Sequence, residues 1–370
     1  MEQAARGSAC LTPYVEQYIR TLWSRDAQPD LRAGKGFERV HAGLTRPHLL
    51  SSSSSGSASF SDPRIPPGSD WSVFPKGSAM HSFLTQLLFS LIGRRATYRI
   101  GQALYQKARG DVRNDIESNG ETLVQSCVVD AWKRGGFSGQ RLVVFDVGAN
   151  VGDWSSALVS LLRNSNTCEG VDLYVFEPVP STFEFLKNRL GDQVPVPHFE
   201  RVALSSENGE GVMYVTAPNA GTNSLHAGSL RGDRQQIPIV RATATDFCRA
   251  HGIQKVHLLK CDTEGHDMEV IRGALPLLAD ERISVLQFEY NHRWIFARNF
   301  LRDAFMSIEK LPYKLAMLQP DHILIFGEWN HELDRFFEGN YALVHVDALD
   351  WFPTKRVSWD RYNTMRVERQ

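Results

Sequence analysis

One stretch of the sequence decides the fold, and it reads Arg141-Leu142-Val143-Val144-Phe145-Asp146-Val147-Gly148-Ala149-Asn150-Val151-Gly152-Asp153-Trp154. Leu142 to Val147 is a short run of β-branched and aromatic residues, which predicts a buried parallel strand. Glycines follow at once and permit a tight turn, and apolar residues then recur at helical spacing from Trp154 to Leu162. The stretch therefore predicts a strand, a turn and a helix whose N-terminal amides point at a ligand over the strand end.

The spacing of the glycines limits the class of ligand that the turn can bind. The pattern Asp-x-Gly-x-x-x-Gly differs from the Gly-x-Gly-x-x-Gly turn that binds dinucleotides, which argues against a nicotinamide-dependent oxidoreductase. A second strand pattern, Val171 to Phe176, is followed by Glu177. In doubly wound sheets an acid at this place can accept both hydroxyls of a ribose. The alternative is a solvated acid at a strand end.

Together these residues resemble class I S-adenosylmethionine-dependent methyltransferases. The resemblance implies an α/β fold with a doubly wound, mostly parallel, seven-stranded Rossmann-like sheet, and S-adenosyl-L-methionine as the cofactor. It implies that the methionine part of the cofactor contacts Asp146, Gly148, Asn150 and Gly152, and that Glu177 binds the ribose.

Composition excludes several classes of protein. The chain has 370 residues and a formal net charge of −1, so no global attraction to nucleic acid is expected. Its five cysteines contain no Cys-x-x-Cys pair, which argues against a disulfide framework or a zinc site and favours a reducing, cytoplasmic location. No run approaches the roughly 20 apolar residues of a membrane span.

Four regions follow from the composition along the chain. Residues 1–79 contain a serine run and many prolines and are expected to be largely disordered. Residues 80–139 are a helical lead-in, residues 140–350 the main domain, and residues 351–370 a charged, aromatic tail. In the lead-in, residues 83–92 have an apolar helical stripe ending at Gly93-Arg94-Arg95. This helix either docks onto the main domain or lies at a membrane surface with its arginines at the headgroups; its shortness favours docking.

Strand and helix patterns alternate beyond residue 141. A helix is expected over 181–190, a third strand over 199–205 and a β insertion around 212–215, with a short strand at 237–240. Late strands are expected at 313–318, 322–326 and 341–345.

A second cluster of charged residues follows the strand pattern Val256-His257-Leu258-Leu259-Lys260-Cys261. The next residues are Asp262-Thr263-Glu264-Gly265-His266-Asp267, and a helix pattern begins there. So many ionisable groups at one strand end indicate a functional site, although Lys260 could instead form a purely structural ion pair with Asp262 or Glu264.

Here the resemblance narrows to the FkbM-type methyltransferase family, whose signature is met by Lys260, Asp262, Glu264, Gly265, Asp267 and Gly273. The likeness covers roughly residues 140–330. Two positions depart from it: Asp267 stands where Glu is more usual, and residues 243–247 lack the usual Leu-Asp pair. The family implies methyl transfer to an oxygen, usually a hydroxyl of a sugar, a glycolipid or a polyketide-like acceptor. N-methylation and a noncatalytic scaffold are the alternatives.

Methyl transfer to a hydroxyl requires alignment of the acceptor and a group that removes a proton. Asp262, Glu264 and His266 are the candidate bases. His266 lies outside the family signature, and its other interpretation is an exposed residue in the first turn of a helix. Lys260 either holds the carboxylates in position or steers an acidic acceptor, and the first role is favoured.

The acceptor site is expected after the strand that contains residues 286–289. Polar and aromatic residues gather there, and sugars often stack on aromatic rings. The predicted acceptor residues are Glu289, Tyr290, Asn291 and Trp294; the alternative is a capped helix start with Trp294 and Phe296 in the core. No metal is predicted, because Asp262, Glu264 and Glu289 lack the spacing of a known metal site even though carboxylates can bind divalent cations.

Overall fold

The computed structural model describes residues 79–112, 115, 118–135, 137, 139–216, 223–226, 228 and 234–368. The segment expected to be disordered, residues 1–79, lies outside these ranges except for its last residue. Residues 23–97 form one unit, and residues 1–22 with 98–370 form another.

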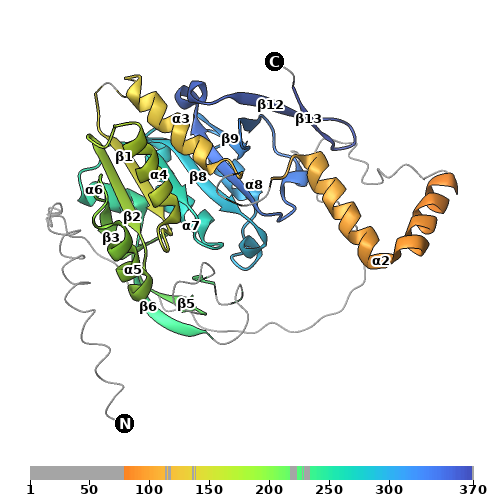
Figure 1. Ribbon diagram of the computed structural model, residues 1–370, viewed down its shortest axis with the longest axis horizontal. Coiled ribbons are helices and arrows are strands. Elements are labelled where there is room, and N and C mark those ends of the chain that lie inside the picture. Colours follow the sequence, from red (N-terminus) through yellow and green to blue (C-terminus); the bar gives the residue numbers. More distant parts are fainter. Residues whose placement is uncertain are drawn as a thin grey trace, which may run out of the picture. The chain divides into compact units, whose positions relative to one another are not determined.

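Five parallel strands form the half of the main sheet that holds the predicted site (Figure 1). Their order is β3-β2-β1-β7-β8, so the strand after the glycine turn lies in the middle, next to the strand that carries the charged cluster. This central pairing brings the two stretches singled out in the sequence to one edge of the sheet. The bounds are β1 Leu142–Val147, β2 Val171–Phe176, β3 His198–Glu200, β7 Val256–Cys261 and β8 Ile283–Tyr290.

The other half of the sheet is mixed. Strand β11 (Gly339–His345) runs antiparallel to both β8 and β9 (Tyr313–Leu318), and β10 (Ile323–Phe326) is antiparallel to β9. Strands β12 (Thr354–Trp359) and β13 (Met365–Val367) extend the edge. Within the ranges that the structure describes, the sheet thus has ten strands rather than the expected seven. The seven from β3 to β9 match the expectation, and part of the predicted tail supplies β12 and β13.

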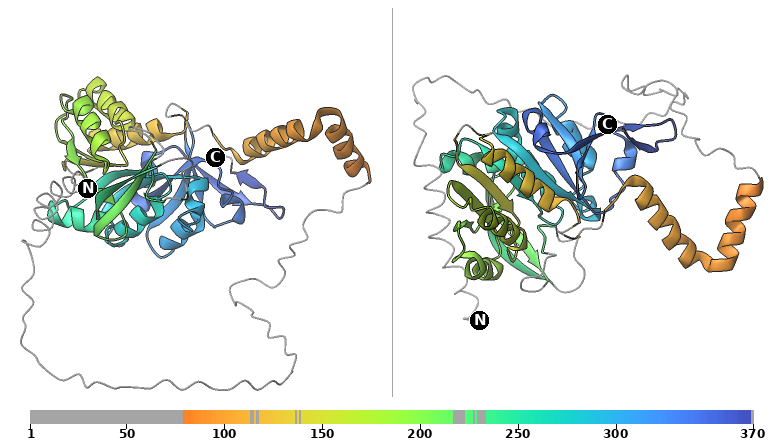
Figure 2. Two further views of the ribbon diagram at one scale, coloured as in Figure 1. Left: turned by 90° about the horizontal axis from the view of Figure 1, so that it is seen from below. Right: turned by 45° about the horizontal axis from the view of Figure 1, so that its top comes forward.

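Helices cover both faces of the sheet, as the doubly wound prediction requires (Figure 2). On one face lie α3 (Glu121–Lys133), α4 (Asp153–Asn164) and α5 (Pro180–Leu190), which bury Val128, Leu158 and Leu186. On the other face lie α6 (Ala244–Ala250), α7 (Asp267–Ala279) and α8 (Leu301–Ser307), which bury Phe247 and Ile271. The central strands β7 and β8 are therefore buried along their whole length.

A separate small sheet lies beside the carboxyl end of β2. It has the order β4-β6-β5, with β4 at Ala203–Leu204, β5 at Gly209–Val215 and β6 at Gln235–Ala242. The third predicted strand is therefore split: residues 198–200 pair with β2, whereas residues 203–204 pair with β6. Val179, Met213 and Ile239 pack together beneath the small sheet.

Helix α2 (Ala79–Arg109) precedes the sheet and is interrupted at Gly93, whose φ of 72° and ψ of 163° are not helical. Gly93 is where the sequence pattern placed the end of the apolar stripe. Most side chains of that stripe lie outside the described part of the structure. Within the described ranges, no helix has both the length and the apolar composition needed to cross a membrane.

Candidate cofactor and acceptor site

The glycine turn after β1 is built from left-handed residues. Gly148, Asn150 and Gly152 have φ values of 79°, 48° and 84°. A Cβ atom at Gly148 would lie 2.0 Å from the carbonyl oxygen of Asp262, so only glycine fits there. The amides of Gly148 and Ala149 donate to the carbonyl of Phe176 at 3.1 and 3.0 Å. The turn is thus held against the ends of both β2 and β7.

Asp146 and Lys260 form a buried ion pair at the centre of the sheet. The register of β1 and β7 sets the two residues opposite each other. Lys260 Nζ lies 3.2 Å from Asp146 Oδ1 and 3.6 Å from Asp262 Oδ2. Burial lowers the pKa of Lys260, but the carboxylates of Asp146 and Asp262 outweigh this effect and hold it above its ordinary value. Because two carboxylates already neutralise the Lys260 ammonium, the geometry favours a role for Lys260 in holding these carboxylates in position over one in steering an acidic acceptor.

Glu177 lies at the end of β2 with its carboxylate facing the turn. Its Oε2 accepts a hydrogen bond from the amide of Asn150 at 3.1 Å, and its Oε1 accepts one from the amide of Val179 at 2.8 Å. Each carboxylate oxygen retains acceptor capacity for a ligand hydroxyl. Burial raises the pKa of Glu177 to about 7, despite the opposing effect of the two amides.

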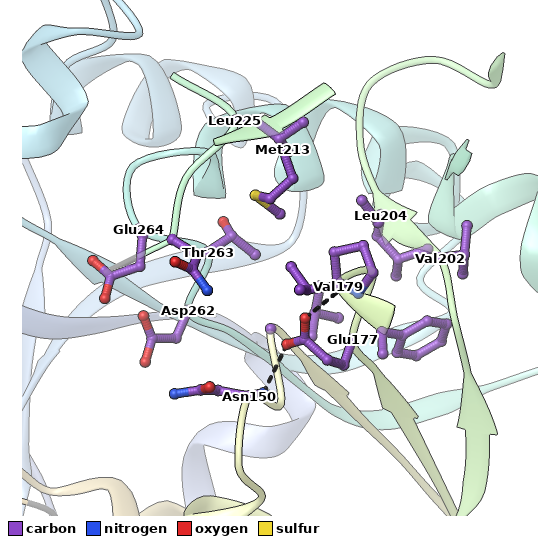
Figure 3. A pocket seen from close by; sticks show the side chains of 16 residues that line it. Asn150, Glu177, Val179, Val202, Leu204, Met213, Leu225, Asp262, Thr263 and Glu264 are labelled. Carbon is purple, nitrogen blue, oxygen red and sulfur yellow. Dashed lines mark hydrogen bonds between the residues drawn. The ribbon is translucent and has the colours of Figure 1, made fainter. Parts of the chain in front are cut away.

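Two cavities meet at the end of the sheet. The first, here called the cofactor pocket, encloses about 640 Å³ including space open to solvent. Figure 3 shows Asp262 and Glu264 at one end of it and the apolar side chains of Leu204 and Val202 at the other. The second, here called the polar cavity, encloses about 690 Å³, again including space open to solvent. Both cavities are lined by Gly148, Asn150 and Asp262, and the polar cavity also by Asn119, Glu121, Lys260, Glu289 and Asn340.

The loop after β7 carries two acids of the candidate site, Asp262 and Glu264. Asp262 has a side chain that is 42% exposed and reaches both cavities. Glu264 adopts a left-handed φ of 56° and pairs with Arg293, with 3.0 Å between Oε2 and Nε. Burial, with the nearby charge of Asp262, raises the pKa of Glu264 to about 8.

Asp267 holds this loop in shape, a role that was not predicted from its position in the sequence. Its buried carboxylate accepts hydrogen bonds from the amides of Thr263 and Gly265 at 3.1 and 3.2 Å. Burial raises its pKa to about 7. The signal in the sequence was an acid in the first turn of a helix, where it can cap free amides.

His266 is not exposed, which corrects one of its two interpretations. It is 5% exposed and bonds to Ser205 Oγ at 3.0 Å and to His226 at 3.3 Å. It lines neither cavity, and burial lowers its pKa to about 3. The structure therefore places His266 behind the loop, apart from the other candidate bases.

The predicted acceptor residues divide into two groups. Glu289 lines the polar cavity, and Asn291 Nδ2 donates to its Oε2 at 2.7 Å. Tyr290 and Trp294 line neither cavity and are fully buried in the core, which corrects their prediction as acceptor residues. Tyr290 donates to Asp334 at 3.0 Å, and Trp294 Nε1 donates to the carbonyl of Glu289 at 2.9 Å.

Three residues of the polar cavity were missed in the sequence. Asn119 lies just before α3, Glu121 is the first residue of α3, and Asn340 belongs to β11. Gln287 Nε2 donates to Glu121 Oε1 at 2.7 Å, which ties the start of α3 to β8. Glu121, an acid in the first turn of α3, was a weak signal for a role in the site. The strand pattern around Asn340 gave no signal for such a role.

Residues of this site fall within a known protein family. The family model described as methyltransferase FkbM domain matches residues 146–318. Residues 146–318 are a methyltransferase FkbM domain. The FkbM domain is that of an S-adenosylmethionine-dependent methyltransferase, so S-adenosyl-L-methionine is the cofactor of the family. The cradle at Gly148 and the acceptor oxygens of Glu177 in the cofactor pocket fit such a group.

A curated relative and two solved structures are similar to the chain. Hexuronic acid methyltransferase AglP of Haloferax volcanii is 25% identical over 188 residues, covering 50% of this chain and 70% of AglP. The DszA carbon methyltransferase structure has 11% identity and a TM-score of 0.36, covering 61% of this chain and 54% of that chain. The WbdD structure has 13% identity and a TM-score of 0.32, covering 65% and 42%. The chain thus spans about half the length of these two structures.

Proposed function

We propose that this protein is an O-methyltransferase that transfers the methyl group of S-adenosylmethionine to a hydroxyl of a small, sugar-type acceptor. The observation that carries the proposal is the position of Asp262, whose carboxylate lines both the cofactor pocket and the polar cavity. A donor in one cavity and an acceptor in the other would meet beside this side chain. The relative named as a hexuronic acid methyltransferase supports a sugar as the acceptor class.

The cofactor supplies a methyl group that its sulfonium charge has already activated. Glu177 would bind the ribose hydroxyls, and the apolar side chains of Leu204 and Val202 would pack against the base. The residues of the turn would hold the methionine part. Residues at these places would together position the methyl group near the boundary of the two cavities.

In the polar cavity the carboxylate of Asp262 would accept the proton of the acceptor hydroxyl as that oxygen takes the methyl group, and S-adenosylhomocysteine would be the other product. Lys260 holds Asp262 in place from below. Glu289, whose pKa burial raises well above its ordinary value, would carry a proton and donate it in a hydrogen bond to a second hydroxyl of the acceptor. A polyol fits this set of donors and acceptors.

The cofactor site is tested by calorimetric titration with S-adenosylmethionine and S-adenosylhomocysteine. We expect Glu177→Ala to weaken binding about ten- to a hundredfold, since charge-assisted hydrogen bonds contribute roughly 1.5–3 kcal/mol. Glu184→Ala, on the exposed face of α5, is the matched control and should bind as the wild type does. Absence of binding by folded wild-type protein would contradict the proposal and favour a noncatalytic scaffold.

A further inference from the structure

A further cavity lies at the amino ends of the central parallel strands, whereas the cofactor pocket lies at their carboxyl ends. This amino-end cavity encloses about 640 Å³ including space open to solvent, and its lining comes from the starts of β7 and β8 and from the end of β11. Three of its polar side chains are almost fully buried: His257, Ser284 and His345 are 2%, 5% and 5% exposed. Buried polar groups around a cavity are typical of a small-molecule site.

Strand pairing sets these three polar residues next to one another. The parallel register of β7 and β8 places His257 beside Ser284. The antiparallel register of β11 and β8 places His345 on the other side of Ser284. The polar residues of the cavity therefore lie on three neighbouring strands of the main sheet, which is a rigid support for a ligand.

The backbone fixes which nitrogen of His257 is the donor. Its Nδ1 accepts a hydrogen bond from the amide of Val143 at 3.0 Å, so the ring hydrogen is on Nε2. Burial, with the nearby charge of Lys255, lowers the pKa of His257 to about 4, so the ring is neutral at pH 7. Among the residues that the structure describes, neither His257 Nε2 nor the Ser284 hydroxyl has a hydrogen-bond partner. The cavity therefore offers two buried donors to a ligand.

The charges around the cavity favour a ligand with a single negative charge. Lys255 is the one lysine or arginine among the described lining residues, and it donates to the carbonyl of Glu281 at 2.6 Å, which uses one of its three N–H groups. The one lining carboxylate, Asp347, has a side chain that is 88% exposed, so water screens its charge. His345 Nε2 lies 3.3 Å from the Glu281 carboxylate. One ammonium beside two neutral donors matches a carboxylate better than a phosphate dianion.

Aromatic side chains also line the cavity. Phe137 stacks on the ring of His257 with 4.2 Å between ring centroids, and the ring of Trp351 lies 5.0 Å from that of Phe137. A planar ring packs favourably against such a surface. The cavity thus combines an aromatic wall with a cluster of hydrogen-bond donors.

We infer that the amino-end cavity is a second ligand site, which binds a small aromatic carboxylate. The carboxylate would accept hydrogen bonds from His257 Nε2, the Ser284 hydroxyl and the Lys255 ammonium, and the ring would pack against Phe137 and Trp351. The two buried donors would then have the partners that buried polar groups ordinarily have. This inference goes beyond the proposed function and does not depend on it, because the cavity shares no lining residue with the cofactor pocket or the polar cavity.

The test is calorimetric titration of the full chain with benzoate at pH 7, with benzamide and inorganic phosphate as comparison probes. We expect saturable binding of benzoate to one site per chain. Benzamide, which lacks the charge, and phosphate, which lacks the ring, should bind at least about tenfold more weakly. Lys255→Met should weaken benzoate binding at least about tenfold, and Ser284→Ala about three- to tenfold. Saturation with S-adenosylhomocysteine should leave benzoate binding unchanged.

The matched controls are Lys310→Met and Ser160→Ala, whose side chains are exposed and do not line this cavity. Both should bind benzoate as the wild type does, and circular dichroism with thermal unfolding establishes that each variant is folded. Three results would overturn the site: no saturable binding by the folded wild type, wild-type affinity in Lys255→Met or Ser284→Ala, or displacement of benzoate by S-adenosylhomocysteine. Equal affinity for benzamide, or tighter binding of phosphate, would overturn the class of ligand.

Discussion

A substitution of Asp262 tests the proposed chemistry most directly, because this residue lines both cavities. Asp262→Asn keeps the shape of the side chain but removes the proton acceptor. We expect methyl transfer to the best sugar acceptor to fall about 10²–10⁴-fold, with little change in the affinity for S-adenosylhomocysteine. Asp130→Asn, on the exposed surface of α3, is the control. An unchanged rate would remove Asp262 from the reaction and leave Glu264 as the next candidate.

Glu177 should make cofactor binding depend on pH. Burial raises its pKa from 4.5 to about 7, so without ligand the carboxyl holds a proton below that pH. Ribose hydroxyls donate to the ionised form, so binding should strengthen as pH rises through 7 and weaken below it, approaching about tenfold per pH unit. Calorimetric titration with S-adenosylhomocysteine at several pH values measures this change in the dissociation constant. If the dependence persists in Glu177→Gln, another carboxyl, such as Asp267, is responsible.

At the scale of elements, the site depends on a backbone contact between the loops after β1 and β7. Gly148→Ala would set a Cβ 2.0 Å from the carbonyl oxygen of Asp262. We expect it to lower the free energy of unfolding by about 1–3 kcal/mol more than Gly139→Ala does, the typical cost of overpacking. Gly139 has a similar φ of 77° but nothing within 4 Å of its Cβ position, so it controls for backbone strain alone. Urea unfolding gives the free energy of unfolding of both variants. Equal decreases in the two variants would show that the loops move apart at little cost.

Elements explain which site residues the sequence could reveal. The turn at 148–152, Glu177 and the acids after β7 follow single strands, so local pattern was enough to place them. Lys260 binds Asp146 across the pairing of two strands, and no local pattern chooses that partner over Glu264. Tyr290 and Trp294 were misjudged because β8 is buried along its whole length, so an aromatic residue at its end is as well suited to the core as to a ligand.

At the scale of the whole molecule, the order of strands and helices from β1 to β8 was largely predictable. Strands β1, β2 and β7 are mostly apolar runs, and each is followed by a helix with apolar spacing: α4, α5 and α7. The extension of the sheet by β12 and β13 was not predictable. Both strands mix charged and apolar residues without regular alternation, and only Val357 is buried, which is equally typical of a surface segment. Edge strands show one face to solvent and so leave a weak pattern.

The central pairing of β1 with β7 also governs when the site can form. The amide of Val143 in β1 donates to the ring of His257 in β7 across 114 residues of intervening chain. Such a long closure is slow. During synthesis the glycine turn leaves the ribosome long before the loop that contacts it, so the nascent chain has no complete cofactor pocket until β7 has been made. The cofactor therefore cannot stabilise the domain through this pocket before β7 has been made.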